Sequence, residues 1–353
     1  MRVLYDSQKF DEQTVGGATR YWHELIQSLT NLPGYEPVVA LRHTANVYAG
    51  SMVGRPYFWQ RRQANRRFSV QLLKRGDFDV FHPTDYDPYF LASIGGKPYV
   101  VTVLDMIHER LPQFFSPRDL TRAWKSQVVR RAAAVVAISQ YTKRDLVELI
   151  GVDPEKVRVV PLASSFATVA AKVVPDAPAR FVLYVGQRGK YKNFTWLVRA
   201  IAPLLRDDQA LSLVCAGGGP WHAGERRLMA TSGIADQVRQ YDVSDGQLAF
   251  LYRRAMALVY PSLYEGFGLP LMEAFACGCP VVASQAGALP EVGEGAALYF
   301  APTDAVGLQQ ALSSVVNDEA VRNSRRVAGQ RRAAQFSWPQ VARQTAAVYE
   351  RVA

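Results

Sequence analysis

The chain has 353 residues, of which 49% are hydrophobic and 20% are charged, which is typical of a globular protein with room for two domains. No run of about 18 apolar residues occurs and Met1–Asp6 resembles a strand, so neither a membrane span nor a secretion signal is expected. The net charge is +10, and the three cysteines lack CxxC and zinc-ligand spacing, so we expect free buried thiols in the cytoplasm.

Apolar runs of strand length alternate with segments of helical periodicity along the chain, which predicts a parallel α/β architecture. In the first half, the predicted strands are Val3–Tyr5, Val38–Arg42, Val80–His82, Tyr99–Val103, Ala134–Ser139 and Val157–Pro161. The predicted helices are Thr19–Leu29, Arg118–Arg131 and Thr142–Ile150. Ser139 or Thr142 would cap the last of these helices.

A basic-aromatic stretch without any acidic residue separates Glu36 from Asp77. Its cations are Arg42, Arg55, Arg61, Arg62, Arg66, Arg67, Lys74 and Arg75, and its aromatic residues are Tyr57, Phe58, Trp59 and Phe68. The region Arg55–Arg75 would suit an anionic membrane surface or a lipid-pyrophosphate acceptor, but a solvated helix face explains it equally well. Because no nucleic-acid-binding motif accompanies it, we expect no nucleic-acid partner.

The periodicity is lost from Leu162 to Arg180, where Ala, Ser and Pro dominate, so residues 163–180 are predicted to link two α/β domains. The predicted strands of the second half are Phe181–Val185, Leu211–Ala216, Ala257–Tyr260 and Pro280–Ser284. The predicted helices are Phe194–Leu205, Asp245–Arg254, a short one beginning near Pro270, Ala305–Asn317, Glu319–Gln335 and Ser337–Val352.

The most informative stretch is Tyr260–Ser284, YPSLYEGFGLPLMEAFACGCPVVAS, in which seven residues separate Glu265 from Glu273. Gly and Pro exclude one continuous helix, so Glu265 should lie in a loop and Glu273 in the first turn of a helix that Pro270 opens. The N–H groups of Gly268–Leu271 would then form a site suited to phosphate. The alternative is an ordinary β-loop-α-β unit with both carboxylates in solvent.

This stretch resembles the E-x7-E signature of retaining glycosyltransferases of family 4, which have the GT-B fold. The resemblance implies two Rossmann-like domains that face a cleft, with ligands at the carboxyl ends of the strands. It also implies a last helix that crosses back to the N-terminal domain. The expected domains are 1–162 with 338–353, which would bind the acceptor, and 181–337, which would bind the nucleotide sugar.

The resemblance assigns roles within this stretch. Glu273 would hold the ribose hydroxyls of the nucleotide, and Glu265 would face the donor sugar at the reacting centre. Backbone N–H groups of Phe267, Gly268 and Leu269 would hold the sugar and the diphosphate.

A second loop, FVLYVGQRGKYKN at Phe181–Asn193, ends a strand at Gly186 and carries Arg188 and Lys192. It resembles the phosphate-clamping loop of the family, in which an Arg and a Lys neutralise the diphosphate of the leaving group. Lys190 is a further cation in the loop, and a solvated basic turn is the alternative interpretation.

Near the N-terminus, Gly16 and Gly17 in QTVGGATRY resemble the glycine loop of the family, which flanks the diphosphate and the acceptor. Arg20 would then contact the acceptor or a phosphate. A glycine pair is often only a turn, so this pattern is less specific than the two loops above.

The segment Pro98–Glu109, PYVVTVLDMIHE, resembles the part of the family pattern in which a His-Asp pair ends a strand beside the donor sugar. Here Leu104 replaces the histidine and Asp105 remains as the predicted catalytic carboxylate. His108 could substitute for the histidine only if the backbone turns it inward. His82 ends another strand and is predicted, with His108, on the acceptor side.

Two D-x-D pairs, Asp77–Asp79 and Asp85–Asp87, have the form that holds a divalent metal in the other major glycosyltransferase fold. Asp85–Asp87 is the better candidate of the two because it follows a strand. Since two cations already supply charge for the phosphates, we expect no metal and no cofactor besides the nucleotide-sugar co-substrate.

Together the resemblances predict transfer of a hexose with retention of anomeric configuration. The phrases MRVLYDSQKFDEQTVGGATRYWHEL and YVGQRGKYKNF resemble bacterial enzymes of lipopolysaccharide and capsule assembly, many of which are mannosyltransferases. We therefore expect a GDP-sugar donor such as GDP-mannose, and a saccharide or lipid-linked saccharide acceptor at the inner face of the cytoplasmic membrane. The alternatives are a UDP-sugar-dependent transferase, a GT-B epimerase or sugar-nucleotide hydrolase, and a nucleotide-sugar-binding protein that has lost catalysis.

Overall fold

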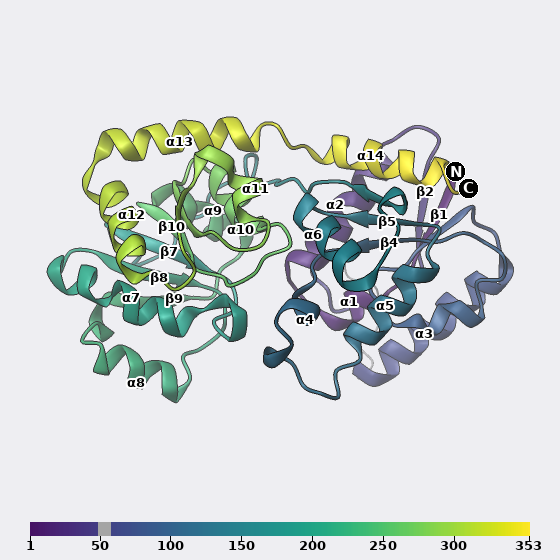
Figure 1. Cartoon of the computed structure of the whole chain (residues 1–353), viewed down its shortest axis with the longest axis horizontal. Coiled ribbons are helices and arrows are strands. Elements are labelled where there is room, and N and C mark those ends of the chain that lie inside the picture. Colours follow the sequence, from purple (N-terminus) through teal and green to yellow (C-terminus); the bar gives the residue numbers. More distant parts are fainter. Residues whose placement is uncertain (49–57) are drawn as a thin grey trace. The chain divides into compact units, whose positions relative to one another are not determined.

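The computed structural model describes residues 1–48 and 58–353, which divide into two compact units (Figure 1). Unit 1 comprises Met1–Leu162 and Ser337–Ala353, and unit 2 comprises Ala163–Phe336. Each unit contains parallel strands that are connected by helices. Arg55 and Tyr57 of the basic-aromatic stretch lie outside the described residues.

The strands of unit 1 are all parallel and follow the order β2-β1-β3 and β4-β5-β6, with a single parallel bridge between Phe81 and Tyr99 joining the two sets. The strand order therefore reverses between β1 and β3, where doubly wound sheets bind ligands. The strands are β1 (Arg2–Tyr5), β2 (Glu36–Val39), β3 (Val80–His82), β4 (Val100–Val103), β5 (Ala134–Ala137) and β6 (Val157–Val159).

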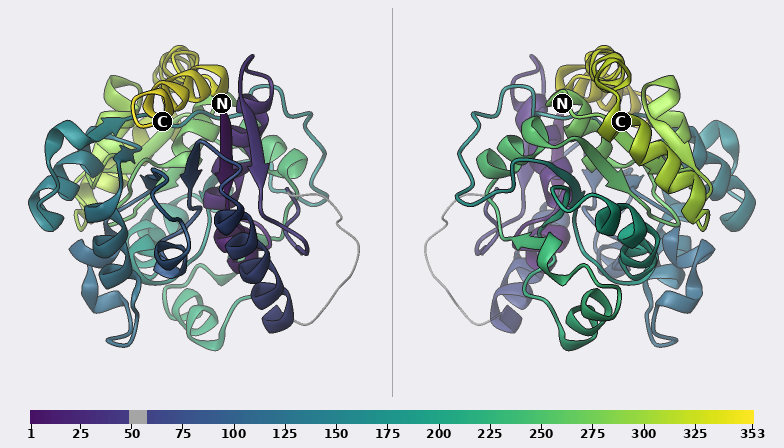
Figure 2. Two further views of the ribbon diagram at one scale, coloured as in Figure 1. Left: turned by 90° about the vertical axis from the view of Figure 1, so that its right-hand side faces the viewer. Right: turned by 90° about the vertical axis from the view of Figure 1, so that its left-hand side faces the viewer.

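The helices of unit 1 include the last helix of the chain, which packs against α2 and brings the two chain ends near each other in Figures 1 and 2. The hydroxyl oxygens of Tyr5 and Tyr349 lie 2.7 Å apart there. The helices are α1 (Gln8–Glu12), α2 (Gly17–Thr30), α3 (Phe58–Arg75), α4 (Ile107–Arg110), α5 (Thr121–Arg131), α6 (Gln140–Asp145) and α14 (Trp338–Glu350), with shorter turns at Pro88–Ala92, Pro112–Phe114, Leu146–Ile150 and Pro154–Lys156.

The sheet of unit 2 has six parallel strands in the order β12-β11-β10-β7-β8-β9, which is the strand order of a dinucleotide-binding Rossmann fold. Its order reverses between β7 and β10, so their carboxyl ends mark the expected ligand position. The strands are β7 (Phe181–Val185), β8 (Ser212–Ala216), β9 (Val238–Tyr241), β10 (Ala257–Tyr260), β11 (Val281–Ser284) and β12 (Leu298–Phe300).

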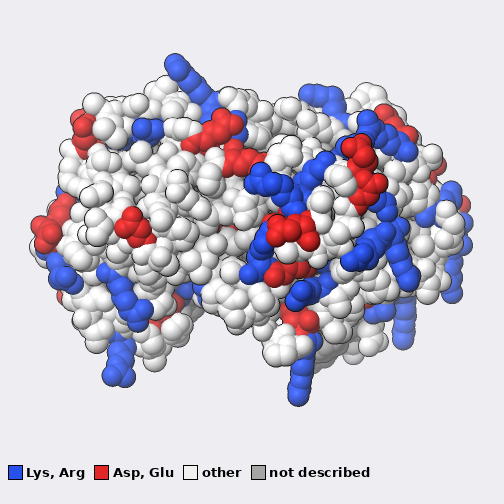
Figure 3. All heavy atoms as spheres, in the orientation of Figure 1, with Lys and Arg blue, Asp and Glu red and all other residues white. Residues whose placement is uncertain are grey.

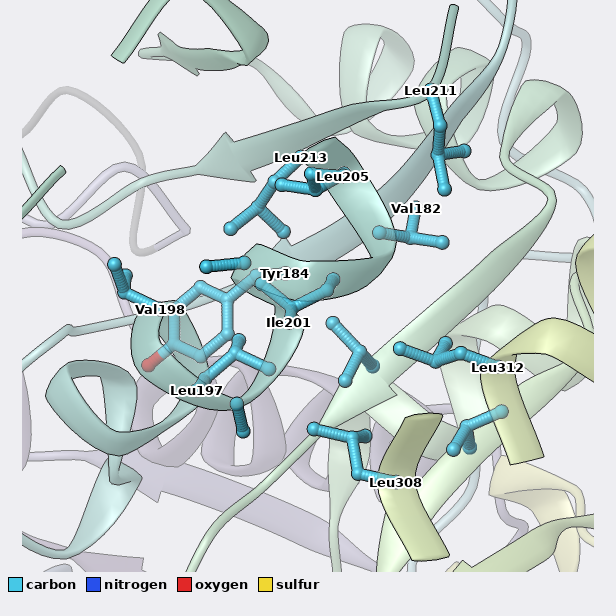
Figure 4. Close-up of a cluster of buried hydrophobic side chains, with 14 of the residues drawn as sticks. Val182, Tyr184, Leu197, Val198, Ile201, Leu205, Leu211, Leu213, Leu308 and Leu312 are labelled. Atoms are coloured by element: carbon cyan, nitrogen blue, oxygen red, sulfur yellow. The ribbon is translucent and has the colours of Figure 1, made fainter. Parts of the chain in front are cut away.

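The core of unit 2 lies between this sheet and the apolar face of α7. Leu197, Ile201 and Leu205 recur at helical spacing, are fully buried, and face Val182 and Leu213 of the sheet (Figure 4). Burial of each such side chain contributes about 1.5–3 kcal/mol. The helices are α7 (Phe194–Asp207), α8 (Ala223–Thr231), α9 (Asp245–Arg254), α10 (Leu269–Ala276), α11 (Leu289–Gly293), α12 (Ala305–Asn317) and α13 (Glu319–Ala333), with turns at Lys190–Lys192, Ala235–Gln237 and Glu294–Ala296.

Several elements differ from the sequence-based expectation. The strands β9 and β12 were not predicted, because both lie at the edges of the sheet, where a strand does not need apolar residues on both faces. The strand β2 begins at Glu36, two residues before the start of the predicted strand Val38–Arg42. The helix predicted to begin at Thr142 begins at Gln140, because the Ser139 hydroxyl caps it by accepting from the Thr142 N–H at 2.9 Å.

The three cysteines are free thiols, but Cys277 is only half-buried, whereas full burial was expected. No helix in the described parts of the chain combines the length and the apolar character needed to cross a bilayer.

Candidate active site

The loops that follow β7 and β10 meet where the strand order of unit 2 reverses. The Leu263 N–H donates to the Tyr191 carbonyl at 2.8 Å, so a backbone hydrogen bond joins the two loops. Lys192 comes from the first loop and Glu265 from the second. The fold therefore brings together two of the side chains that the sequence predicted, at the position where a nucleotide would bind.

Lys192 and Glu265 form an ion pair in which Nζ lies 2.6 Å from Oε1. Their side chains are 18% and 10% exposed, so the pair is shielded from water but reachable by a ligand. The ammonium also lies over the rings of Tyr191 and Tyr260, at 5.1 and 5.6 Å from their centroids. Lys192 is thus a positioned cation that a diphosphate could recruit.

The backbone of Glu265 is held by the loop after β11. The Ala288 N–H donates to the Glu265 carbonyl at 2.9 Å. Gly287 adopts a left-handed φ of 58°, and a Cβ there would lie 2.3 Å from the Glu265 carbonyl oxygen. Only glycine fits so close to this backbone. Sequence reasoning missed Gly287, because its neighbour Glu265 is far away in the sequence.

The helix α10 begins after Gly268, whose φ of 97° and contact with Leu289 require glycine. Glu273 lies on this helix just beyond the first turn, in which it was expected, and is 7% exposed. Its Oε2 accepts a hydrogen bond from the Tyr252 hydroxyl at 3.0 Å. Burial and the adjacent carboxylate raise the pKa of Tyr252, so the phenol stays a donor and orients Glu273.

Arg188 lies in the same loop as Lys192, but its guanidinium turns into unit 2. It bonds Glu225 through Nε at 2.8 Å and the carbonyls of Gly217, Gly219 and Pro220 at 2.9–3.0 Å. Burial opposes ionisation of Glu225, but hydrogen bonds from Arg188 outweigh it and keep the pKa of Glu225 below its usual range. In this structure Arg188 braces a turn, and its predicted contact with diphosphate stays a prediction.

The braced turn is Gly217–Gly219, in which all three φ angles are left-handed, at 83°, 77° and 71°. A Cβ on Gly218 would lie 2.4 Å from Nη1 of Arg188. Gly186, at the end of β7, is adjacent to this turn and has a φ of 115°. Glycines therefore line the carboxyl ends of β7 and β8, where the missing side chains permit the close approach of Arg188.

His82 does not line a ligand site, contrary to the prediction, because it is fully buried in the core of unit 1. Its Nδ1 lies 2.7 Å from the Tyr349 hydroxyl and its Nε2 lies 3.0 Å from Oγ1 of Thr102. Burial lowers the pKa of His82 to about 3, so the imidazole is neutral. The pattern of a histidine at a strand end could not reveal that α14 covers it.

Asp105 caps the start of α4, since its Oδ1 accepts from the Ile107 N–H at 3.1 Å. His108 stacks on Phe115 with ring centroids 3.8 Å apart, and its Nε2 lies 3.5 Å from Asp119. Burial and the nearby Lys125 lower the pKa of His108. The structure gives both predicted residues local partners and does not test their contact with a substrate.

Gly16 and Gly17 form the start of α2, where Gly16 is extended, with a φ of 168°. Arg20 of the same helix donates to the Tyr48 hydroxyl at 2.9 Å. Phe267, predicted to offer its N–H to the donor, buries its ring against Phe336. These positions agree with a glycine turn and a backbone role, and their ligand contacts remain predictions.

The D-x-D pairs are engaged in protein contacts. Asp85 lies 2.6 Å from Lys9, Asp87 lies 3.4 Å from Arg66, and Asp79 accepts from the Arg2 N–H at 2.7 Å. Across residues 1–48 and 58–353, no group of three or more His, Cys, Asp and Glu side chains is arranged to hold a metal ion.

Solved structures share this fold over nearly the whole chain. The HepE protein of Anabaena in complex with UDP-glucose has a TM-score of 0.78 at 17% identity, with 99% of this chain and 100% of that chain covered. Sucrose-phosphate synthase from Thermosynechococcus elongatus has a TM-score of 0.77 at 22% identity, covering 99% and 98%. The two doubly wound units thus share the GT-B fold of these structures, and the expected fold is confirmed.

The sequence comparisons are more specific. The model of glycosyl transferases group 1 matches residues 167–333, and that of glycosyltransferase family 4 matches residues 15–163. An MMP alpha-(1->4)-mannosyltransferase from Mycolicibacterium hassiacum is 35% identical over 79% of this chain and 72% of its own length. O-antigen chain mannosyltransferase B from Escherichia coli is 27% identical over 81% and 77%. The chain belongs to glycosyltransferase family 4.

Proposed function

We propose that the protein transfers a mannosyl residue from GDP-mannose to a hydroxyl of a saccharide or lipid-linked saccharide, with retention of anomeric configuration. The observation that carries this proposal is the Lys192–Glu265 pair at the strand reversal of unit 2, in a chain of family 4. The pair offers one cation for a leaving group and one carboxylate for the sugar that departs from it.

The leaving group in such a transfer is a nucleoside diphosphate, whose negative charge grows as the glycosidic bond breaks. Lys192 and the N-terminus of α10 would stabilise that charge, because both are positioned before the substrate arrives. Glu273 would accept hydrogen bonds from the ribose hydroxyls, in the orientation that Tyr252 imposes. The glycines at the carboxyl ends of β7 and β8 would permit close approach of the diphosphate.

Retention would follow a front-face path. The bond from the anomeric carbon to the diphosphate oxygen breaks, and the acceptor oxygen bonds to the same face of that carbon. The proton of the acceptor hydroxyl passes to the departing diphosphate, so no side-chain base is required. Glu265 would favour the positive charge that builds on the anomeric carbon.

The identity of the donor rests on the relatives. Three relatives are described as mannosyltransferases, among them the O-antigen chain mannosyltransferase RfbU of Salmonella typhimurium. They support GDP-mannose and an acceptor of polysaccharide or O-antigen synthesis. The HepE structure, which contains UDP-glucose, favours a UDP-sugar as the second candidate donor.

A thermal-shift panel of GDP, UDP, ADP, CDP and dTDP, with EDTA and with Mn²⁺, tests the donor base. A ligand that binds only the folded state raises the melting temperature. We expect GDP to raise it most, equally with EDTA and with Mn²⁺. A shift that requires metal would contradict the metal-independent proposal, and a shift with UDP alone would replace the donor.

Turnover of GDP-mannose with and without mannobiose then distinguishes the remaining functions. A transferase should release GDP faster when the saccharide is present and should extend the saccharide with an α-linkage. Turnover that no saccharide changes would indicate the epimerase or hydrolase. Tight GDP binding without turnover would indicate a binding protein that has lost catalysis.

We further propose a peripheral contact with anionic lipid at the cytoplasmic face of the membrane. Arg67, Lys74 and Arg75 of α3 are exposed. By contrast, Arg61 pairs with Asp11, and Arg62 and Arg66 with Asp87. Acidic and basic side chains also lie beside one another on the face drawn in Figure 3. The lipid contact would therefore depend on only part of the basic-aromatic stretch.

Vesicle pelleting tests this contact. Replacing Arg67, Lys74 and Arg75 by Ser should release the protein from vesicles that contain phosphatidylglycerol. The matched control replaces three exposed cations of unit 2, Arg199, Arg227 and Arg254, and removes the same charge. Equal loss of binding in both variants would show that the effect comes from net charge alone. Unchanged pelleting of the variant in α3 would contradict the proposed contact.

A further inference from the structure

A pocket of about 100 Å³ opens in unit 1 at the carboxyl ends of β1 and β3, where the strand order reverses. Its walls come from α1, the loop after β3, one residue of α3 and the start of α5. None of Arg20, His82 and His108, which the sequence predicted on the acceptor side, belongs to the lining. The pocket therefore differs from the acceptor residues that the sequence predicted, although its lining includes the D-x-D pair Asp85–Asp87.

The walls of the pocket are preorganised by Gln8. Its Nε2 donates to Oδ2 of the buried Asp6 at 2.7 Å, and its Oε1 accepts from the Asp87 N–H at 2.9 Å. The amide thus ties the turn after β1 to the loop after β3. Walls that are fixed before binding reduce the entropy that a ligand must lose.

The charge of the pocket is balanced, because each of the four carboxylates that line it has a cation nearby. The pairs are Glu12 with Lys9 at 2.5 Å, Asp85 with Lys9 at 2.6 Å, Asp87 with Arg66 at 3.4 Å and with Arg62 at 3.7 Å, and Asp11 with Arg61 at 3.8 Å. A cationic ligand would have to displace these cations, and an anionic ligand would meet the carboxylates. The chemistry of the pocket favours an uncharged ligand.

The lining also offers the two kinds of contact that a sugar ring needs. A carboxylate that accepts from one cation retains lone pairs, so Glu12, Asp85 and Asp87 could accept hydrogen bonds from hydroxyl groups. Trp124 of α5 is half-buried at the pocket, and within the described residues its indole makes no hydrogen bond or ring contact with another side chain. Its face can cover the C–H side of a ring.

We propose that this pocket binds an uncharged sugar residue of the acceptor. The inference rests on the proposed function, because the pocket would hold the substrate that receives the mannosyl group. It goes further because it predicts that the pocket excludes acceptors whose bound sugar residue carries a phosphate or an amine.

The test uses the whole chain labelled with 5-fluorotryptophan and followed by ¹⁹F NMR, with the Trp124 resonance assigned from Trp124→Phe. The probes are methyl α-mannopyranoside, mannose 6-phosphate and glucosamine. We expect the neutral sugar to shift the Trp124 resonance and leave that of Trp196 in unit 2 unmoved. The charged sugars should need at least about tenfold higher concentrations for the same shift.

Two variants locate the effect by saturation-transfer NMR on the neutral sugar. Trp124→Ala should abolish transfer, whereas Leu120→Ala should leave it unchanged, since Leu120 is 52% exposed and does not line the pocket. Loss of transfer in both variants, or in neither, would overturn the proposed pocket.

Other outcomes also decide the proposal. A stronger response to glucosamine or to mannose 6-phosphate would overturn the neutral-ligand inference, and no response to any sugar would overturn the site. The nucleoside diphosphate panel is read independently. If a diphosphate binds and no sugar moves Trp124, the pocket inference fails alone. If sugar moves Trp124 and no diphosphate binds, the sugar site stands, but the proposed function fails and the acceptor role of the pocket fails with it.

Discussion

Nζ of Lys192 lies 2.6 Å from Oε1 of Glu265, although 73 positions separate the two residues in the sequence. The cation predicted for the leaving group and the carboxylate predicted for the sugar are therefore each other's partners before any ligand binds. A diphosphate that recruits Lys192 would compete with Glu265 for the ammonium. Binding of the donor would thus change the environment of both groups in one step.

Removing the ammonium of Lys192 should impair transfer more than binding. We expect Lys192→Ala to lower kcat about 10²–10³-fold, because the developing charge on the diphosphate loses its nearest cation. Steady-state kinetics with GDP-mannose measure this effect. Lys190→Gln, in the same loop, is the matched control and should stay near wild type; equal losses in both variants would argue against a specific role of Lys192.

The contact between Gly287 and the backbone of Glu265 predicts an effect at a distance from the ligand. Gly287→Ala should lower kcat, because a Cβ 2.3 Å from the Glu265 carbonyl must displace that loop. Binding of GDP through Glu273 should change much less. Gly295→Ala is the control, since a Cβ there meets nothing within 4 Å. Wild-type kcat in Gly287→Ala would show that this contact does not position Glu265.

Glu273 should contribute mainly to nucleotide affinity. We expect Glu273→Ala to weaken binding of the preferred nucleoside diphosphate by about 1.5–3 kcal/mol, the value of hydrogen bonds to a charged group. Tyr252→Phe removes only the hydroxyl that orients this carboxylate, so it should cost less. Isothermal titration calorimetry measures both. If Glu273→Ala binds the nucleotide as wild type does, the assignment of the ribose site is wrong.

Replacing Arg188 tests whether this residue is a structural brace or a ligand contact. Arg188→Gln should lower the free energy of unfolding by about 3–5 kcal/mol, because it leaves buried Glu225 without its partner. Urea unfolding measures this change, and Arg199→Gln on the exposed face of α7 serves as the control. Unchanged stability with weakened diphosphate binding would instead support the phosphate clamp that the sequence predicted.

The burial of His82 predicts a dependence of stability on pH. Its pKa is about 3 in the folded chain and 6.5 when exposed, so only the unfolded state binds this proton between those values. The contribution of His82 is complete above pH 6.5 and is lost as the pH falls toward 3. One proton corresponds to a slope of about 1.4 kcal/mol per pH unit.

Urea unfolding of the wild type and of His82→Gln at several pH values measures that slope. The variant lacks the titrating imidazole, so its stability should fall less steeply on acidification, whatever the carboxylates contribute to both proteins. Parallel pH profiles would show that His82 is not the buried neutral group that the structure describes.

Much of the fold follows from local patterns. The alternation of apolar runs and helical periodicity predicted the parallel α/β architecture, and Gly and Pro around Glu265 and Glu273 predicted the loop and the helix. The choice between Arg188 and Lys192 did not follow from these patterns. Both are cations in one short loop, and only the folded structure shows that Lys192 reaches Glu265 whereas Arg188 reaches Glu225.

The partners of charged and buried groups are the part that only the tertiary structure decided. The sequence by itself determined most of the elements, the family signature and the loops that carry Lys192 and Glu265, because spacing and turn residues act over a few neighbours. It could not show that Asp11 and Asp87 neutralise arginines of α3, or that Tyr349, 267 positions away, buries His82. Such contacts depend on which distant segments pack together, and local periodicity does not encode that choice.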